Sequence, residues 1–188
     1  MKVLIAEDET LIRLDLRGML EKAGLEVCAE ARDGVEAVEL AGAAEPDVVL
    51  LDVKMPRLDG IEAARRILEE RPMPIVMVSA FTERSLVARA AEAGVFGYLA
   101  KPFREEDLLP AIATARARFE QLAEVREQVD SLAEALAARK AIERAKGLLM
   151  ASQNLSEQEA FVRLRRASQS SGRPMRVIAE AIVETLGQ

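Results

Sequence analysis

The chain has 188 residues, of which 50% are apolar, and its formal net charge is −6, so it can form one domain of ordinary size and a smaller one. It contains no histidine and a single cysteine, Cys28, which excludes an internal disulfide framework, zinc fingers and histidine-based catalysis. No apolar run is long enough to span a bilayer and Met1 leads directly into an expected strand, so we expect no membrane association, no secretory signal and a cytoplasmic location.

The first half of the chain alternates short apolar runs with helix-like segments. Uncharged runs such as 3–5, 48–51 and 75–78 predict buried parallel strands. Polar residues that follow the carboxyl ends of such strands converge on one crevice, so three acids, a hydroxyl and an amine are expected to meet there. The residues at these strand ends are Glu7, Asp8, Glu9, Asp52, Ser79 and Lys101.

These residue types suit the chemistry of a phosphorylated carboxylate. Asp52 is the best candidate nucleophile, because a carboxylate can form an aspartyl phosphate when a metal neutralises the charge on the transferred group. Asp8 and Asp52 would supply the one or two carboxylates that Mg²⁺ takes from a protein, with Glu7 behind them. Lys101 would pair with one phosphate oxygen, and the Ser79 hydroxyl would bind another.

Taken singly, each of these residues has a structural interpretation. An acid after a strand is more often a helix cap or a loop residue, a lone serine a turn residue, and a lone lysine a solvated side chain. Their joint placement after four separate strands favours the functional interpretation.

Four stretches in this half carry a specific pattern: VLIAEDE at 3–9, LDVKMPRLDG at 51–60, VSA at 78–80 and GYLAKPF at 97–103. Through them, residues 1–115 resemble the receiver domain of two-component response regulators. The resemblance implies an α/β fold of the flavodoxin type with a five-stranded, doubly wound parallel sheet. It also implies that a sensor histidine kinase phosphorylates Asp52.

The resemblance assigns roles to further residues. It implies Mg²⁺ held by Asp8, Asp52 and the backbone carbonyl of Lys54. It implies that Ser79 moves toward the phosphate and that Tyr98 turns inward, which changes the surface formed by the fourth helix, fifth strand and fifth helix. The Lys101–Pro102 bond resembles one that is often cis in the family. The Lys54 side chain itself is interpreted as a solvated loop lysine.

Residues 116–138 are predicted to be a helical, coiled-coil-like linker. The stretch from 105 to 136 lacks glycine and is unlike a flexible tether. Its apolar residues are spaced 3, 4, 3, 3, 4, 3 and 4 apart, which predicts a dimerisation stalk with one three-residue discontinuity. The alternative is a long helix folded back on its own domain. Pro110 would kink the helix unless the helix begins just before it. The spaced residues are Ile112, Ala115, Phe119, Leu122, Val125, Val129, Leu132 and Leu136.

Residues 139–188 are predicted to form a small three-helix bundle. A first helix runs through Ile142 and Leu149, a capping box opens the second at Ser156, and Pro174 precedes the third. The apolar stripes are expected to be core, and Phe161, the one aromatic residue of this segment, is expected to be core as well. The segment has nine Lys or Arg and five Glu and carries +4, which leaves −10 for residues 1–138 and favours an anionic partner.

A second resemblance covers about residues 132–184. IERAKGLLM at 142–150, SEQEAF at 156–161, LRRA at 164–167 and VIA at 177–179 are similar to the ANTAR domain of transcription antitermination regulators. The resemblance implies a phosphorylation-controlled protein whose homodimers bind paired stem-loops in nascent messenger RNA. Binding would prevent an overlapping terminator hairpin from forming.

Which basic side chains would contact RNA stays open at this point, and the arginines are the expected stacking residues because Phe161 is assigned to the core. Alternative outputs are a protein partner, with the basic residues only solvating the bundle, or DNA, although the last helix is too apolar and acidic for a recognition helix. An enzymatic output has no nucleophile–base pair or metal-ligand cluster to support it. The RNA-binding candidates are Lys140, Arg144, Lys146, Arg163, Arg165, Arg166, Arg173 and Arg176.

Overall fold

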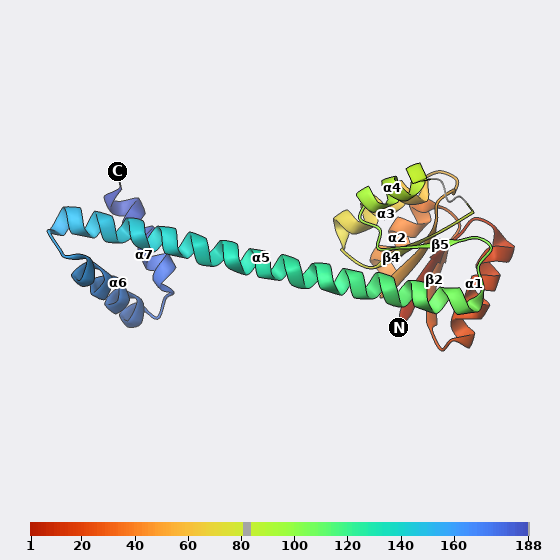
Figure 1. The fold of residues 1–188 in the computed structure, drawn as a ribbon, viewed down its shortest axis with the longest axis horizontal. Coiled ribbons are helices and arrows are strands. Elements are labelled where there is room, and N and C mark those ends of the chain that lie inside the picture. The colour runs from red at the N-terminus through yellow and green to blue at the C-terminus, as the bar shows by residue number, and fades with distance from the viewer. Residues whose placement is uncertain (81–83, 188) are drawn as a thin grey trace. The chain divides into compact units, whose positions relative to one another are not determined.

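Five parallel strands form one sheet in the order β2-β1-β3-β4-β5 (Figure 1). The computed structural model describes residues 1–80 and 84–187. All residues of β3 and β4 are buried, as expected for central strands that are covered on both faces. The predicted α/β fold with a five-stranded, doubly wound sheet is confirmed. The strands are β1 (Lys2–Ala6), β2 (Glu26–Ala31), β3 (Val48–Asp52), β4 (Ile75–Ser79) and β5 (Gly97–Ala100).

Helices cover both faces of this sheet. On one face, α1 (Thr10–Lys22) and the first turns of α5 (Glu105–Gln153) pack through Leu16, Leu20 and Ile112. On the other face, α2 (Gly34–Ala44), α3 (Gly60–Glu70) and α4 (Arg84–Glu92) contribute a separate apolar cluster. The layers follow from the right-handed crossovers that parallel strands require.

The strand register aligns the carboxyl ends. Asp52, the last residue of β3, pairs with Val78, and Ser79 pairs with Ala100. Ala6, the last residue of β1, pairs with Leu51. The residues that follow β1, β3, β4 and β5 therefore lie at one edge of the sheet, where the sequence places its polar groups.

Helix α5 is longer than the predicted linker and continues into the C-terminal segment. It contains Pro110 in its second turn, where the side chain is exposed to solvent. The chain divides into two compact units, Met1–Ala123 and Glu124–Gln188, and the boundary between them falls within α5. The predicted stalk and the first helix of the predicted bundle are therefore one continuous helix.

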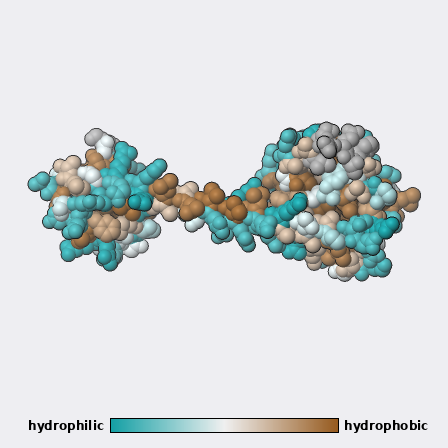
Figure 2. Space-filling view, in the orientation of Figure 1, coloured by the Kyte–Doolittle hydropathy of each residue, from teal (hydrophilic) through white to brown (hydrophobic). Residues whose placement is uncertain are grey.

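The predicted apolar stripe of α5 divides into two parts. Ile112 and Ala115 are buried in the first unit, and Phe119 packs edge-on against Phe96 with ring centroids 5.4 Å apart. The remaining five residues are exposed, and Figure 2 shows hydrophobic side chains along this stretch. The three-residue discontinuity falls between the two parts, so the exposed part has an unbroken 3, 4, 3, 4 spacing. We call it the apolar seam: Leu122, Val125, Val129, Leu132 and Leu136.

The C-terminal unit contains the end of α5, α6 (Glu157–Ser171) and α7 (Met175–Leu186). Its core is small and includes Ala145, Leu149, Leu164 and Ala179. The predicted capping box is present, with the Ser156 side chain accepting from the Glu159 backbone N–H. Among the described residues, no helix is both long and apolar enough to cross a membrane.

The expectation that Phe161 belongs to the core is wrong. Its side chain is 42% exposed, whereas its neighbour Ala160 is fully buried. Successive residues of a helix differ by about 100° in direction, and Ala160 and Leu164 already occupy the core-facing side of α6. The aromatic ring therefore lies on the surface of the unit.

Candidate functional site

Three carboxylates meet at the carboxyl edge of the sheet. Oxygen atoms of Glu7, Asp8 and Asp52 all lie within 4.8 Å of one another. Glu7 and Asp52 are buried, whereas Asp8 is exposed at the mouth of the cluster. The Lys101 Nζ is 2.6 Å from Glu7 Oε2 and 3.0 Å from Asp52 Oδ1. We call these four residues the acidic cluster.

Backbone hydrogen bonds fix the elements that carry this cluster. The Lys101 N–H donates to the Ser79 carbonyl at 2.8 Å, and the Lys101–Pro102 bond is cis, as the resemblance implies. Ser79 is buried at the end of β4, and Tyr98 is partly buried on β5 beside the core. The structure therefore brings Ser79 and Lys101 to one end of the sheet.

Burial dominates the electrostatics of the cluster. Removal from water raises the pKa of Asp52, and the hydrogen bond from Lys101 opposes this shift only in part. Burial likewise raises the pKa of Glu7, with Lys101 again opposing and the Asp52 charge adding to the rise. For Lys101, burial lowers the pKa, but the hydrogen bonds to Glu7 and Asp52 outweigh it and the pKa is raised.

The donor set fits a small divalent cation. Three carboxylates face one ammonium group, so negative charge is in excess at the cluster. Hard cations such as Mg²⁺ bind oxygen ligands and need only one or two carboxylates from the protein. Asp8 is open to solvent, whereas Glu7 and Asp52 are buried and both are bound by Lys101, so Asp8 offers the most accessible carboxylate oxygens.

The loop after Asp52 is held close to the acidic cluster. The Lys54 N–H donates to Asp52 Oδ2 at 3.0 Å, and the Gly60 N–H donates to the Val53 carbonyl at 2.9 Å. A Cβ at Gly60 would lie 1.9 Å from the Asp52 carbonyl oxygen, so only glycine fits there. The Lys54 side chain is exposed to solvent, as the loop interpretation expects.

Sequence reasoning missed an ion pair that ties this loop to α2. Arg57 has a left-handed backbone conformation, with φ of 62°, and its Nε donates to Asp33 Oδ2 at 2.7 Å. The Asp33 carboxylate also caps α2 by accepting from the backbone N–H groups of Val35 and Glu36. Burial alone would raise the pKa of Asp33. The α2 cap hydrogen bonds and Arg57 together outweigh it, so the pKa is lowered. An aspartate before a helix signals a cap, but no local pattern links it to a residue 24 positions away.

A second missed residue is Arg13 on α1. It is buried, and its Nη1 donates to the Glu7 carbonyl oxygen at 2.7 Å. Its Nε lies 3.3 Å from Glu30 Oε2. Arg13 therefore fixes the backbone of Glu7 through a hydrogen bond from α1. The helical pattern of α1 does not reveal this role.

The predicted RNA-binding residues divide into several groups. Lys146 is buried, with its Nζ 2.6 Å from Glu157 and 3.0 Å from Glu143, and so joins α5 to α6. Arg176 pairs with Glu180 at 2.7 Å. Lys140 and Arg144 line a hollow of about 310 Å³ together with Glu180 and Glu184. The remaining candidates are exposed: Arg163, Arg165 and Arg166 on α6, and Arg173 in the turn before α7.

Comparison with known proteins identifies a family for each part of the chain. The response regulator receiver domain family matches residues 3–113, and the ANTAR domain family matches residues 130–183. The transcriptional regulatory protein PdtaR of Mycobacterium tuberculosis is 50% identical over 186 residues, which cover 99% of this chain and 91% of PdtaR. Both resemblances stated from the sequence are confirmed.

Other similarities cover the receiver part alone. A protein-glutamate methylesterase/protein-glutamine glutaminase of Pyrococcus horikoshii is 42% identical over 104 residues, which cover 54% of this chain and only 28% of that protein. The signal receiver domain of a modulated diguanylate cyclase from Desulfovibrio desulfuricans G20 has a TM-score of 0.59 at 34% identity and covers 64% of this chain and 96% of that chain. A chain of the CheX-CheY-BeF3-Mg complex from Borrelia burgdorferi has a TM-score of 0.58 at 28% identity. This match covers 60% of the present chain and 86% of the Borrelia chain.

We expect Asp52→Asn to raise the melting temperature of the protein in metal-free buffer at pH 7. The raised pKa means that folding favours the protonated acid, so charging Asp52 costs stability. This cost is absent below the ordinary pKa of aspartate and appears as the pH rises through the raised pKa. At pH 7 we therefore expect the variant to melt at a higher temperature than the wild type, by roughly a few degrees.

Scanning calorimetry over a pH series measures this gain. The difference should vanish near pH 3, where both side chains are neutral, and Mg²⁺ should stabilise the wild type more than the variant. Asp130→Asn, an exposed change on α5, is the control. A lower melting temperature for Asp52→Asn than for wild type at pH 7 would contradict the electrostatic account.

We expect Arg57→Ala to increase amide hydrogen exchange in residues 53–59 roughly two- to fivefold, the size typical of a partly exposed ion pair. Arg57→Gly removes the same pair but suits the left-handed conformation, so its effect should be smaller. In an Asp33→Asn background, which keeps the α2 cap, Arg57→Ala should add little. Exchange measured by mass spectrometry tests this, and full additivity of the two changes would show that the ion pair does not hold the loop.

Proposed function

Because this chain belongs to the response regulators that join a receiver domain to an ANTAR domain, we propose that it is a phosphorylation-controlled antiterminator that binds stem-loops in nascent messenger RNA. The observation that best supports this is the acidic cluster, a site suited to aspartyl phosphate chemistry, in one chain with an ANTAR domain. We place the receiver at 1–115, the linker at 116–138 and the ANTAR domain at 139–188.

Asp52 is the proposed phosphoryl acceptor. Its carboxylate oxygen attacks the phosphorus of a phosphohistidine on a sensor histidine kinase, and the new O–P bond forms as the P–N bond breaks and the imidazole leaves. Asp8, Asp52 and the Lys54 carbonyl would hold Mg²⁺, which would neutralise charge on the transferred group. Lys101, whose Nζ is already 3.0 Å from Asp52 Oδ1, then pairs with a phosphoryl oxygen. The ion pair with Glu7 keeps the Lys101 side chain in this position.

The new phosphoryl group carries about 1.5 to 2 negative charges and three acceptor oxygens. We assign Ser79 as the residue that donates its hydroxyl to one of them, because it lies at the end of the strand next to β3. Tyr98 on β5 follows as the switch residue, and β5 packs against α5 at Gly97, where an added Cβ would lie 3.2 Å from the Ala115 Cβ. Phosphorylation shifts populations only through contacts that differ between the two states, and these are the candidates.

The apolar seam is the proposed dimer interface. Its five residues are between 38% and 71% exposed although all are apolar, so they offer hydrophobic surface to a second chain. Their 3, 4, 3, 4 spacing is that of a two-stranded coiled coil, but the seam covers only two heptads. So short a seam gives a weak dimer, and its equilibrium can therefore respond to phosphorylation.

Dimerisation would present two RNA-binding modules together. Once one stem-loop is bound, the second is held at high effective concentration, so a tandem target binds more tightly than a single one. A DNA-reading output has less support, because α7 contributes Ala179, Ile178 and Ile182 to the small core and is not a free polar helix.

We expect the phosphorylated protein to bind tandem stem-loops at least tenfold more tightly than single ones. The RNA is a pair of adjacent stem-loops selected from a pool with randomised loops, and acetyl phosphate or beryllofluoride with Mg²⁺ activates Asp52. Asp52→Ala should lose the response to activation. A steep salt dependence is expected because bound phosphates release counterions. Equal binding of both RNAs, or of activated wild type and Asp52→Ala, would overturn the coupling.

We expect Leu132→Asp to abolish self-association of the activated protein without unfolding it, because this side chain is 71% exposed. Ser131→Asp is the matched control, since it adds the same charge one residue away and outside the seam. Sedimentation over a concentration series, with and without beryllofluoride, measures the dimer. Loss of the dimer in both variants, or in neither, would move the interface away from the seam.

A further inference from the structure

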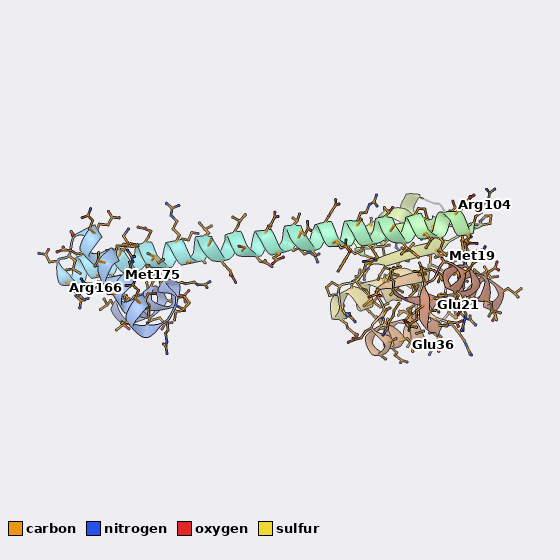
Figure 3. All side chains as sticks on the ribbon, turned by 90° about the horizontal axis from the view of Figure 1, so that it is seen from below. Met19, Glu21, Glu36, Arg104, Arg166 and Met175 are labelled. Carbon is orange, nitrogen blue, oxygen red and sulfur yellow. The ribbon has the colours of Figure 1, made fainter. Side chains whose placement is uncertain are left out.

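The α6 arginines differ from the other basic residues of the C-terminal unit. Among the described residues, no carboxylate lies within ion-pair distance of Arg163, Arg165 or Arg166, whereas Lys146 and Arg176 are paired. Ala160 and Leu164 turn inward, so the arginines project from the exposed side of α6, and Arg166 is labelled in Figure 3. These guanidinium groups are free to bind an anion.

Two of the three arginines border a hollow of about 510 Å³ on the surface of α6. Leu155, from the turn before the helix, and Val162, which is 46% exposed, give it an apolar part. Gln158 adds an exposed amide that can both donate and accept hydrogen bonds. The full lining is Leu155, Gln158, Glu159, Val162, Arg163 and Arg166.

Glu159 is the one acidic residue in this lining, and its carboxylate is already engaged. Its Oε2 accepts from the Ser156 backbone N–H at 2.9 Å and from the Ser156 hydroxyl at 2.7 Å. These bonds lower the pKa of Glu159, so it stays charged, but they direct the carboxylate to the helix start. The two arginines therefore leave the hollow with a net positive charge.

We propose that this hollow binds one unpaired base of an RNA hairpin loop together with its flanking phosphates, an inference that rests on the proposed function. Leu155 and Val162 contact the face of the base, and Gln158 contacts its edge. Arg163 and Arg166 pair with the phosphates on either side. Sequence-specific RNA recognition uses unpaired loop bases because their faces and edges are accessible, and phosphate contacts position them.

The charge of the unit favours RNA over a protein partner. Residues 139–188 carry nine Lys or Arg against five Glu. A second hollow of this unit, at Lys140 and Arg144, contains Glu180 and Glu184 as well, so its charges are balanced. The α6 hollow combines unpaired guanidinium groups with an apolar surface, which a phosphate-linked base matches in both respects.

The first test compares Arg166→Ala with Arg139→Ala, which removes the same charge from an exposed position on α5 that lies outside the lining and is not one of the RNA-binding candidates. The probe is the selected tandem stem-loop RNA, bound to the activated full-length chain over a salt series. We expect Arg166→Ala to weaken binding about five- to tenfold. The slope of log affinity against log salt concentration should fall by about 1, the change that the loss of one phosphate contact produces. Arg139→Ala should weaken binding less than twofold.

The second test locates the base. Each loop position of the RNA is replaced in turn by an abasic nucleotide, and the loss of affinity is measured for wild type and for Val162→Asp. At one position the two losses should not add, because both remove the same contact. Circular dichroism melts check that each variant is folded. We expect all of them to fold, because the substituted side chains are exposed in the wild type.

The outcomes separate the site from the function. Failure of the wild type to prefer any stem-loop RNA would overturn both. RNA binding by the wild type with equal affinity in Arg166→Ala, Arg139→Ala and Val162→Asp would overturn the site alone, and a protein partner would then be the expected ligand of the hollow. Losses that add at every loop position would also overturn it, because the base would then bind elsewhere.

Discussion

Lys101 lies between two buried carboxylates, and the receiver part of the chain is organised around this arrangement. Buried charges are unfavourable unless they are paired, and here one ammonium group serves both Glu7 and Asp52 at 2.6 and 3.0 Å. The third acid, Asp8, lies at the solvent side and leaves the cluster with excess negative charge. The cluster is thus stable enough to fold and still suited to a cation and a phosphoryl group, which would both compensate this excess.

Several long-range contacts keep the cluster in register. The sheet aligns the ends of β1, β3, β4 and β5, so side chains from distant parts of the sequence meet at one edge. Arg13 binds the Glu7 carbonyl from α1, and Arg57 ties the loop after Asp52 to the capping residue of α2. These contacts involve the Glu7 backbone and the loop after Asp52, and neither arginine contacts the Asp52 carboxylate itself.

Helix α5 takes part in every function proposed for the chain. Its first turns belong to the receiver core through Leu108 and Ile112, its middle carries the apolar seam, and its last turns supply Ala145 and Leu149 to the ANTAR core. A change in how the first turns pack against β5 would therefore act on the same helix that carries the apolar seam. The seam is short and the ANTAR core is rich in alanine, so the proposed dimer and the ANTAR unit are both expected to be modest in stability, as the proposed switch between states a few kcal/mol apart requires.

The sequence by itself determined the strand ends, the acidic cluster, the capping box and both families. These features depend on short motifs, strand periodicity and local hydrogen bonds, all of which are readable along the chain. Only the tertiary structure decided that Phe161 is exposed, that Lys146 is buried between Glu143 and Glu157, and that the predicted seam begins at Leu122. It alone paired Arg57 with Asp33. Side-chain burial and ion pairing depend on which distant elements pack together, and helical spacing gives the face of a residue but not what lies against it.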